Sequence, residues 1–359
     1  MADAWQSRYY RRRMVSRSRK ITWLVIAVLL LAALSGGYAW YRSYVAQQLG
    51  LALNNWILAR TAEGYRIDAD IAPESGNLAT VMRGLSDVTI SAPGDAWVLQ
   101  VPEIYVSVSP LNPFSVKFAP DKRLEFRYTV ADDNYVFTND FREGWAGFSY
   151  DHNNQITEAY ITQFWSRLNG PIGINFKSFD AQAHFDPAAP LSNDGKSVEF
   201  NFALEDATVT KPSSLPLGDL IQRVEMDAYV AGTLHPGRPS ESLAAWRDAG
   251  GVLQIQRFVA NWGPLAVTAE GTLALDSQMQ PLFAGTATVR GYGEAIDALE
   301  QARMMAPNQA TGAKIALAAM AKPADDGGPP AAKLPITIQD GFLFVGPLKL
   351  ARMPRIVWQ

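Results

Sequence analysis

The 359-residue sequence contains no cysteine and only three histidines, His152, His184 and His235. The absence of cysteine excludes disulfides, thiolate metal sites and cysteine nucleophiles. No two histidines have the short spacing of zinc ligands, which favours surface or loop positions for all three. No G-x-S-x-G sequence is present to place a serine nucleophile on a sharp turn. The sequence therefore predicts no metal, no cofactor and no enzymatic activity.

Positive charge is scarce outside the N-terminus. Residues 1–20 contain seven basic residues and a single acidic one, Asp3, although the whole chain has a net charge of −3. The remaining chain has 25 basic and 34 acidic residues and a net charge of −9. Nucleic-acid binding needs clustered positive charge for phosphate contacts, so we exclude that class of partner.

A long apolar run follows the basic residues. The segment ITWLVIAVLLLAALSGGYAWY, residues 21–41, has no charge before Arg42. About 20 apolar residues are enough to cross a hydrocarbon core. Trp23 near one end, and Tyr38 and Trp40 near the other, occupy the positions of interfacial aromatic residues. The sequence predicts a transmembrane helix that anchors the chain in the bacterial inner membrane.

The charge asymmetry also predicts the topology of this anchor. Basic residues stay on the cytoplasmic side of a membrane, so residues 1–20 form a cytoplasmic tail and the rest of the chain is exported. In a Gram-negative cell the exported side is the periplasm, a location that suits a cysteine-free chain. A cleaved signal peptide is the alternative, but no A-x-A cleavage site lies near 35–37.

The exported part has a short helical segment followed by a long β-rich region. Residues 42–64 have apolar residues at helical spacing and end at Gly64, which predicts a juxtamembrane helix. From Tyr65 onward the apolar period changes to two, with turn residues between the runs. We predict one exported domain over 65–359, with a possible division into 65–235 and 236–359.

The fold class follows from these patterns. We expect a mainly β (α+β) protein with a curved antiparallel sheet, or an open barrel or groove, because polar residues alternate with apolar ones along most strands. Accessory helices are expected at 240–250 and within 294–320. Residues 321–333 have the composition of a flexible linker, and Asp340–Gly341 marks the turn of a final hairpin.

The clearest block is an antiparallel meander over 252–260, 265–276 and 282–290. The middle strand, LAVTAEGTLALD, has apolar residues on one face and small polar residues on the other. The residues we single out as candidates to face lipid are Leu265, Val267, Leu273, Leu275 and, before the strand, Trp262. Such a face can line a trough for acyl chains. Packing of the same face against the accessory helices explains the pattern equally well.

Two glycine-containing patterns resemble nucleotide-binding motifs. The segment DGKS, 194–197, matches the end of a phosphate-binding loop, but the required first glycine is replaced by Pro190. In VRGYGEAI, 289–296, the third glycine of a dinucleotide motif is replaced by Ile296. We interpret Gly291 and Gly293 as residues that permit a tight strand-to-helix turn.

One group of carboxylates is the remaining candidate for chemistry. Asp132 and Asp133 are adjacent, and Asp140 and Glu143 follow shortly afterwards, so they could serve a metal or a hydrolytic reaction. Adjacent residues of a strand point to opposite faces, however, and do not converge. We interpret this group as a solvated turn and keep a hydrolase as a minor alternative.

The segments GGVLQIQRFVANWGPLAVTAEGTLALDSQMQPLFAGTATVRGYGEAIDAL and DGFLFVGPLKLARMPRI resemble a bacterial family catalogued as a domain of unknown function, number twenty-one twenty-five. The motifs WGP, GTL, GxGxA, DG and GP carry the resemblance, which covers most of residues 40–357. It implies an alphaproteobacterial protein with an N-terminal anchor. The family has no assigned catalytic residues, so none is transferred to this sequence.

A weaker resemblance links RGLSDVTISAPGDAWVLQVPEIYVSVSPLNP, 83–113, to AsmA-like envelope proteins. That group implies anchoring in the inner membrane, a long β groove, and a role in phospholipid transport or outer-membrane homeostasis.

Our leading hypothesis is a membrane-anchored periplasmic protein that is not an enzyme and that binds or passes lipid, or supports envelope assembly. The alternative is a structural or interaction module that docks another envelope protein through a sheet edge or apolar patch. The expected partners are thus the inner membrane, through residues 21–41, and a phospholipid or an envelope protein.

Overall fold

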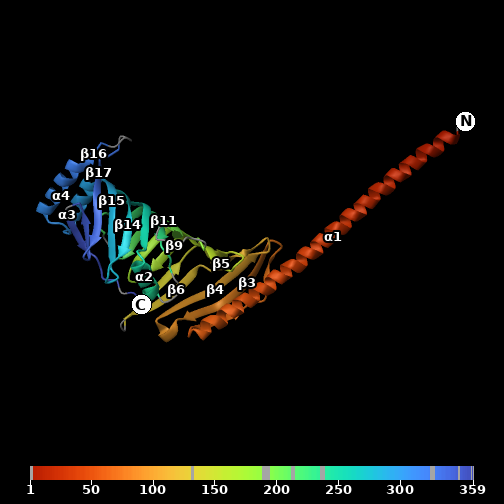
Figure 1. The fold of residues 1–359 in the computed structure, drawn as a ribbon, viewed down its shortest axis with the longest axis horizontal. Helices are drawn as coiled ribbons and strands as arrows, with labels where there is room; N and C mark the ends of the chain where they lie inside the picture. The colour runs from red at the N-terminus through yellow and green to blue at the C-terminus, as the bar shows by residue number, and fades with distance from the viewer. Residues whose placement is uncertain are drawn as a thin grey trace.

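A computed structural model describes residues 3–130, 133–187, 195–211, 215–234, 239–323, 328–346, 348–356 and 358. In this part of the chain, one long helix precedes a single sheet of 19 strands (Figure 1). Each pair of neighbouring strands in the described residues is antiparallel. The expectation of a mainly β protein with a large antiparallel sheet is confirmed.

The helix α1 runs without interruption over Asp3–Ala62. Its 60 residues correspond to a length of about 90 Å. The expected transmembrane and juxtamembrane helices are therefore one continuous element, with no proline to break it. The described segment Trp23–Ala62 includes a stretch long and apolar enough to cross a membrane. Its length and composition are consistent with a single-pass anchor.

The sheet begins with short strands and continues with longer ones. The strands before the second helix are β1 (Arg66–Ile71), β2 (Ser75–Asn77), β3 (Thr80–Ser91), β4 (Trp97–Ser109), β5 (Asn112–Pro120), β6 (Arg123–Val130), β7 (Asp133–Asp140), β8 (Glu143–Tyr150), β9 (Ile156–Asn169), β10 (Gly173–Phe185), β11 (Lys196–Lys211) and β12 (Leu220–Ala231). A 3-10 turn, η1 (Pro93–Asp95), connects β3 and β4.

Between β4 and β9 the sheet divides into two branches. One half of β4 pairs with β5, which pairs with β8, while the other half of β4 pairs with β6, which pairs with β7. Both β8 and β7 then pair with β9. Beyond β9 the strands follow one another in chain order up to β15.

The second part of the chain contains the remaining helices and strands. They are α2 (Pro239–Asp248), β13 (Val252–Trp262), β14 (Leu265–Leu275), β15 (Pro281–Arg290), α3 (Tyr292–Gln301), α4 (Pro307–Met320), β16 (Ala321–Lys322), β17 (Ala331–Gln339), β18 (Phe342–Val345) and β19 (Leu348–Arg352). The meander and the accessory helices are confirmed. The linker assignment for 321–333 is wrong at both ends, because β16 and the start of β17 lie there and pair with each other.

Strands from both expected halves belong to the same sheet. The strand β12 pairs with β13 across the proposed boundary between 65–235 and 236–359. The helix α2 lies between β12 and β13 in the chain and is bonded to the end of β12. The Nε1 of Trp246 in α2 donates a hydrogen bond to the carbonyl of Ala231 at 2.8 Å. The division of the exported part into two halves stays a prediction.

The strand register aligns the apolar residues of successive strands into rows. In the first row, each residue is the direct partner of the next: Val81, Val108, Val116, Phe148, Ala159, Ala183, Phe200, Ala228, Ile255, Gly271, Gly285, Ile336 and Val345. The second row is Val106, Phe118, Ala146, Ile161, Ala181, Phe202, Met226, Phe258, Ala269, Ala287 and Leu334. Directly paired residues point to the same face of a sheet. The two rows thus form one apolar face that crosses most of the sheet.

Two further rows extend this apolar face on either side. One contains Phe185, Val198, Val230, Leu253, Leu273, Phe283, Ile338 and Leu343. The other contains Phe179, Leu204, Val224, Ala260, Val267, Val289 and Ala332.

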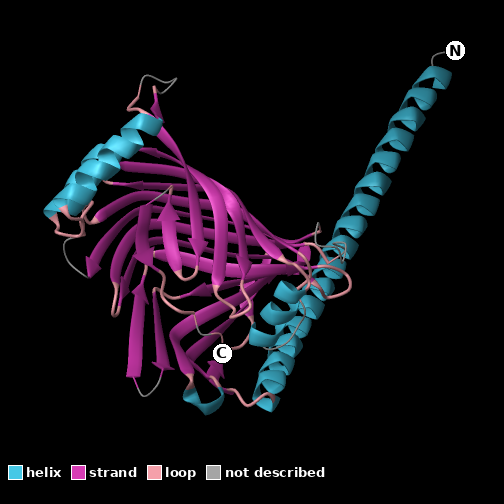
Figure 2. Cartoon of the chain, turned by 60° about the vertical axis from the view of Figure 1, so that its left-hand side comes forward, coloured by secondary structure: helices cyan, strands magenta, loops and turns pink. Residues whose placement is uncertain are grey.

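Helices cover the two ends of this face. Near the first end, Val45, Ala46 and Leu49 of α1 are buried in one hydrophobic cluster with apolar residues of β3 and β4. At the other end, α3 packs against α4, and the pair contacts β14 and β17. Ala287 and Ala332 are completely buried there. Figure 2 shows the sheet curling between α1 and the α3–α4 pair.

A glycine pair in the first row is required by close packing. Gly271 and Gly285 are direct partners, and a Cβ on Gly285 would lie 2.3 Å from the carbonyl oxygen of Glu270 and 2.7 Å from the ring of Phe283. A Cβ on Gly271 would meet the same ring at 2.6 Å. The Phe283 ring therefore lies over both glycines and fills the space that side chains would occupy.

We predict that Gly285→Val destabilises the sheet by about 1–3 kcal/mol, because the new side chain must displace backbone or the Phe283 ring. The measurement is thermal unfolding of the full chain, followed by the β-sheet circular dichroism signal. Gly293→Ala is the matched control, since a Cβ at Gly293 meets nothing within 4 Å. Equal unfolding temperatures for the two variants would contradict this packing.

Candidate functional site

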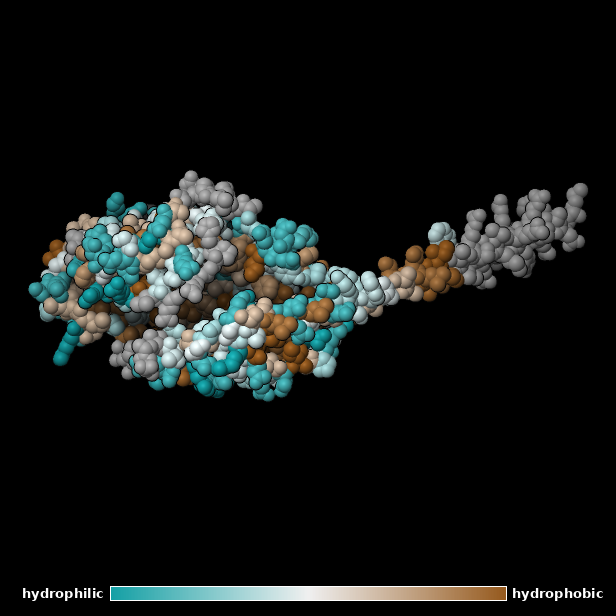
Figure 3. Space-filling model, turned by 60° about the horizontal axis from the view of Figure 1, so that its bottom comes forward, coloured by the Kyte–Doolittle hydropathy of each residue, from teal (hydrophilic) through white to brown (hydrophobic). Residues whose placement is uncertain are grey.

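The central part of the apolar face, over β9–β14, is the candidate site. Figure 3 shows that the body is hollowed, with hydrophobic residues inside the hollow and a mixture of hydrophilic residues and smaller hydrophobic patches on the surrounding surface. The hollow lies on the apolar side of the curved sheet, between the regions that α1 and the α3–α4 pair cover. We call this surface the trough.

The large apolar side chains of the trough are only partly buried, and none of them belongs to the two hydrophobic clusters of the described residues. Each of the following is partly buried, in contrast to the buried residues at the two ends: Ile161, Phe179, Phe185, Val198, Phe200, Phe202, Leu204, Val224, Met226, Val230, Leu253, Ile255, Phe258, Val267 and Leu273. A contiguous apolar surface of this size is rare on soluble monomers and marks a site for an apolar partner.

The structure places two of the candidate lipid-facing residues inside the trough rows. Val267 is paired with Ala260 and Val289, and Leu273 is paired with Leu253 and Phe283. Both side chains are partly buried. Their contact with lipid stays a prediction.

The other three candidates lie at the ends of the meander strands. Leu265 is paired with Trp262 at the β13–β14 turn. The indole Nε1 of Trp262 donates a hydrogen bond to the carbonyl of Gly218 at 2.6 Å, which ties this turn to the β11–β12 connection. Leu275 is buried and is paired with Pro281. The environment of Leu275 favours packing over ligand contact.

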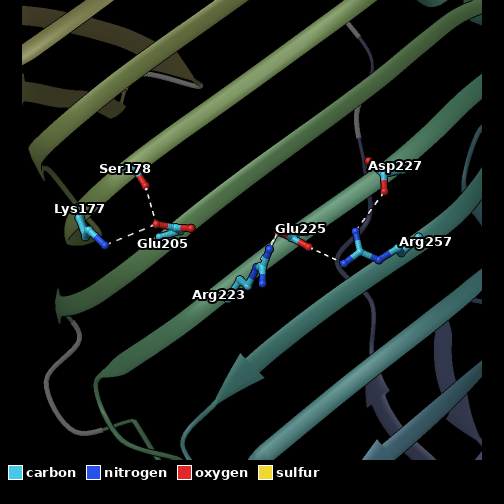
Figure 4. A network of polar contacts seen from close by, with 7 residues as sticks. All are labelled: Lys177, Ser178, Glu205, Arg223, Glu225, Asp227 and Arg257. Carbon is cyan, nitrogen blue, oxygen red and sulfur yellow. Dashed lines mark hydrogen bonds and ion pairs between the residues drawn. The ribbon is translucent and has the colours of Figure 1, made fainter.

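The opposite face of the same strands is polar. Figure 4 shows Glu225 of β12 between Arg223 and Arg257, with Asp227 on the far side of Arg257. Arg257 donates to Glu225 at 2.8 Å and to Asp227 at 3.3 Å. On the neighbouring strands, Ser178 donates to Glu205 at 3.2 Å. These charged groups identify the face that water covers.

The described members of the carboxylate group have separate structural contacts. Asp132 lies outside those residues, and Asp133 is paired with Val130 at the end of the β6–β7 hairpin. Asp140 forms an ion pair with Arg123 at 3.6 Å. Within the described ranges, no group of three His, Cys, Asp or Glu side chains could hold a metal ion.

The described histidines lie apart from each other, and the first glycine of the glycine motif lies in a tight turn. His152 contacts the Phe114 ring with 4.7 Å between centroids, His184 is exposed on β10, and His235 lies outside the described residues. Gly291 has a φ of +69°, and a Cβ there would lie 1.8 Å from the carbonyl oxygen of Pro264. The interpretation of Gly291 as the residue of a tight strand-to-helix turn is confirmed.

The DGKS segment does not form a phosphate-binding loop in its described part. Lys196 and Ser197 belong to strand β11, and the Nζ of Lys196 donates to Glu199 at 2.7 Å. This hydrogen bond raises the pKa of Lys196. Asp194 lies outside the described residues.

Other displaced pKa values have local causes. A hydrogen bond from Tyr105 to Glu103, with 2.5 Å between the oxygens, raises the pKa of Tyr105. Burial raises the pKa of Tyr160. The backbone N–H of Gln155 lowers the pKa of Asp151 in the β8–β9 turn. The main causes at Tyr105 and Asp151 are hydrogen bonds to residues close in sequence, which indicates local geometry.

Small surface pockets outside the trough are lined by both polar and apolar residues. One of about 420 Å³ lies beside the turns at Asp276 and Asp340 and includes Arg352 and Arg355. Another of about 230 Å³ lies between α1 and the sheet, where Arg83 of β3 packs against Gly50.

The comparisons with known proteins identify one family. The family model described as "Uncharacterized protein conserved in bacteria (DUF2125)" matches residues 43–354. No curated protein and no solved structure matches the chain. The resemblance to AsmA-like envelope proteins stays a prediction from sequence.

We predict that Glu225→Gln lowers the free energy of unfolding by at most about 1 kcal/mol, because both arginines remain hydrated. Their side chains are 48% and 50% exposed, although Glu225 itself is 12% exposed. Chemical denaturation of the full chain measures the change, with Glu199→Gln as a control on an exposed pair. A loss of about 3 kcal/mol or more, as for a broken buried pair, would mean that this face is covered.

Proposed function

Given that the chain belongs to the bacterial family DUF2125, we propose that it is a membrane-anchored, non-enzymatic protein that binds lipid acyl chains in the trough. The inner membrane holds α1, and the β-rich part lies in the periplasm. The main observation that supports this proposal is the alignment of large apolar side chains over β9–β14, on a face that the described helices leave uncovered.

The dimensions of the trough suit an acyl chain. Five strand spacings separate β9 from β14, which corresponds to about 24 Å across the strands. An acyl chain spans half of a hydrocarbon core, or about 15 Å. A single lipid tail that lies across the strands therefore runs along a row and spans about three strand spacings.

The chemistry of the trough also suits this occupant. Apolar contacts need no fixed hydrogen-bond partners, so rows of Phe, Leu, Val and Ile bind acyl chains of different lengths. The Phe283 ring lies over Gly271 and adds an aromatic side chain to this apolar surface. The absence of an acid–base pair in the described trough is compatible with binding or passage rather than turnover.

One test of this proposal detects direct contact between the trough and lipid. A benzophenone amino acid replaces Phe202, whose side chain belongs to the second row of the trough. Irradiation of cells that express the full chain is expected to yield lipid adducts of the protein, identified by mass spectrometry. The control places the same group at the neighbouring residue Asn201, which is exposed on the polar face and should yield none.

A protein adduct at position 202, without any lipid adduct, would favour the alternative of a module that docks another envelope protein. Lipid adducts of equal yield at 201 and 202 would also contradict the proposal, because they would show only general contact with the membrane.

Another test of this proposal compares two variants that each add one carboxylate to strand β14. Leu273→Asp places a carboxylate between Leu253 and Phe283, whereas Thr272→Asp places one on the opposite face. Burying an unpaired charge against an acyl chain is costly, so Leu273→Asp should lower the phospholipid that co-purifies with the full chain in amphipol. Thr272→Asp should retain the wild-type amount. Equal lipid content in both variants would exclude the trough as the binding surface.

A further inference from the structure

Two hairpin tips lie beside the point at which the apolar run of α1 ends. The hydroxyl of Tyr38 donates a hydrogen bond to the carbonyl of Leu78, in the β2–β3 turn. The Nε of Arg42 donates to the carbonyl of Asn77 at 3.0 Å, and its Nη1 lies 2.7 Å from Glu74. These contacts fix the β2–β3 tip at the level of Tyr38–Arg42.

A second tip lies at the same end of the sheet. The strands β3 and β4 pair with Val81 opposite Val108, so the β2–β3 turn and the β4–β5 turn are neighbours. The β4–β5 turn contains Leu111. Leu78 and Leu111 are each 77% exposed, which makes them the most exposed large hydrophobic side chains in the described residues.

The two tips have the composition of a surface that enters the interfacial layer of a bilayer. The segments SGNLAT, 75–80, and SPLNPF, 109–114, contain no charged residue. The nearest carboxylate, Glu74, is neutralised by Arg42. The helix side chains at this level are also interfacial in type, since Trp40 is 72% exposed and stacks on Tyr44.

We propose that Leu78 and Leu111 insert into the surface of the same bilayer that α1 crosses, on the exported side. Tyr38 belongs to the outer end of the apolar run 21–41, so a turn bonded to Tyr38 cannot be far from the headgroup layer. The anchor holds the tips at high effective concentration next to the lipid, so two leucines suffice for docking.

Docking of the tips fixes the β3–β5 corner of the sheet on the membrane. Val81, the first residue of the first apolar row, follows Leu78 by three positions. The apolar face therefore begins at the bilayer surface and leads away from it toward β9–β14. The docking requires that α1 spans the membrane, but it does not depend on any ligand in the trough.

The experiment uses the full chain, whose lack of cysteine permits single labels. Leu78→Cys and Leu111→Cys are each labelled with a nitrobenzoxadiazole maleimide. The labelled proteins are reconstituted into phosphatidylethanolamine–phosphatidylglycerol vesicles, with or without lipids that carry a nitroxide near the headgroup. We expect blue-shifted emission and severalfold quenching by the nitroxide lipids at both positions.

Two further labels make the result decisive. Ile315→Cys on α4 replaces another exposed aliphatic residue, 66% exposed, at the far end of the sheet, and should not be quenched. Trp40→Cys reports whether the anchor lies in the bilayer and should be quenched. Quenching at 40 without quenching at 78 and 111 would overturn the docking. Absence of quenching at 40 would overturn the membrane location of α1 and the docking together.

A second pair of variants tests the cause of the docking. Leu111→Asp should reduce quenching of the label at 78, because the charge opposes insertion of the neighbouring tip. Asn112→Asp adds the same charge one residue away on a residue that is already polar and should have a smaller effect. Equal effects of the two variants would overturn the assignment of Leu111 as an inserting residue.

Discussion

The register of the strands is the constraint on which the rest of the structure depends. Side chains alternate between the faces of a strand, so a slip of one residue moves the whole apolar set of that strand to the other face. Across the thirteen strands that connect Val81 to Val345, the register never exchanges the faces. Where extra residues occur, as between Ile255 and Phe258, a bulge absorbs them. The result is a continuous apolar surface about 60 Å long, measured along the sheet.

The helices cover the two ends of this apolar surface and leave its middle for the proposed binding of lipid. The end of α1 buries one end of the apolar face in a hydrophobic cluster with β3 and β4. At the other end, α3 and α4 form a cluster with each other and contact β14 and β17. Between them, side chains such as Phe202 and Phe258 are only partly buried. A core that was completed in the middle would need a further helix there. The uncovered middle is thus the feature that distinguishes a trough from an ordinary two-layer α+β domain.

Much of this fold could be predicted from local sequence, but the trough could not. The period-two alternation of LAVTAEGTLALD identifies β14 and its faces, and Gly250 and Gly291 mark helix boundaries near α2 and α3. The rows depend on which strands pair and in which register, and that information is non-local. The branching at β4 and the pairing of β16 with β17 also depend on strand pairing, which local sequence patterns do not determine. The proline-rich composition of 321–333 concealed the strand ends because its prolines lie outside β16 and β17, which take only the first two and the last three residues of this segment.

The membrane anchor and the sheet are coupled by the continuity of α1. A helix that lacks proline from Asp3 to Ala62 transmits its orientation from the bilayer to the residues that pack on β3 and β4. A flexible linker would let the sheet sample many orientations, whereas this helix and the contacts of Tyr38 and Arg42 allow few. The start of the apolar face is thus held at a fixed place relative to the apolar run of α1. Under the proposed function this placement favours lipid transfer, because a tail then crosses the least water on its way from the bilayer to the trough.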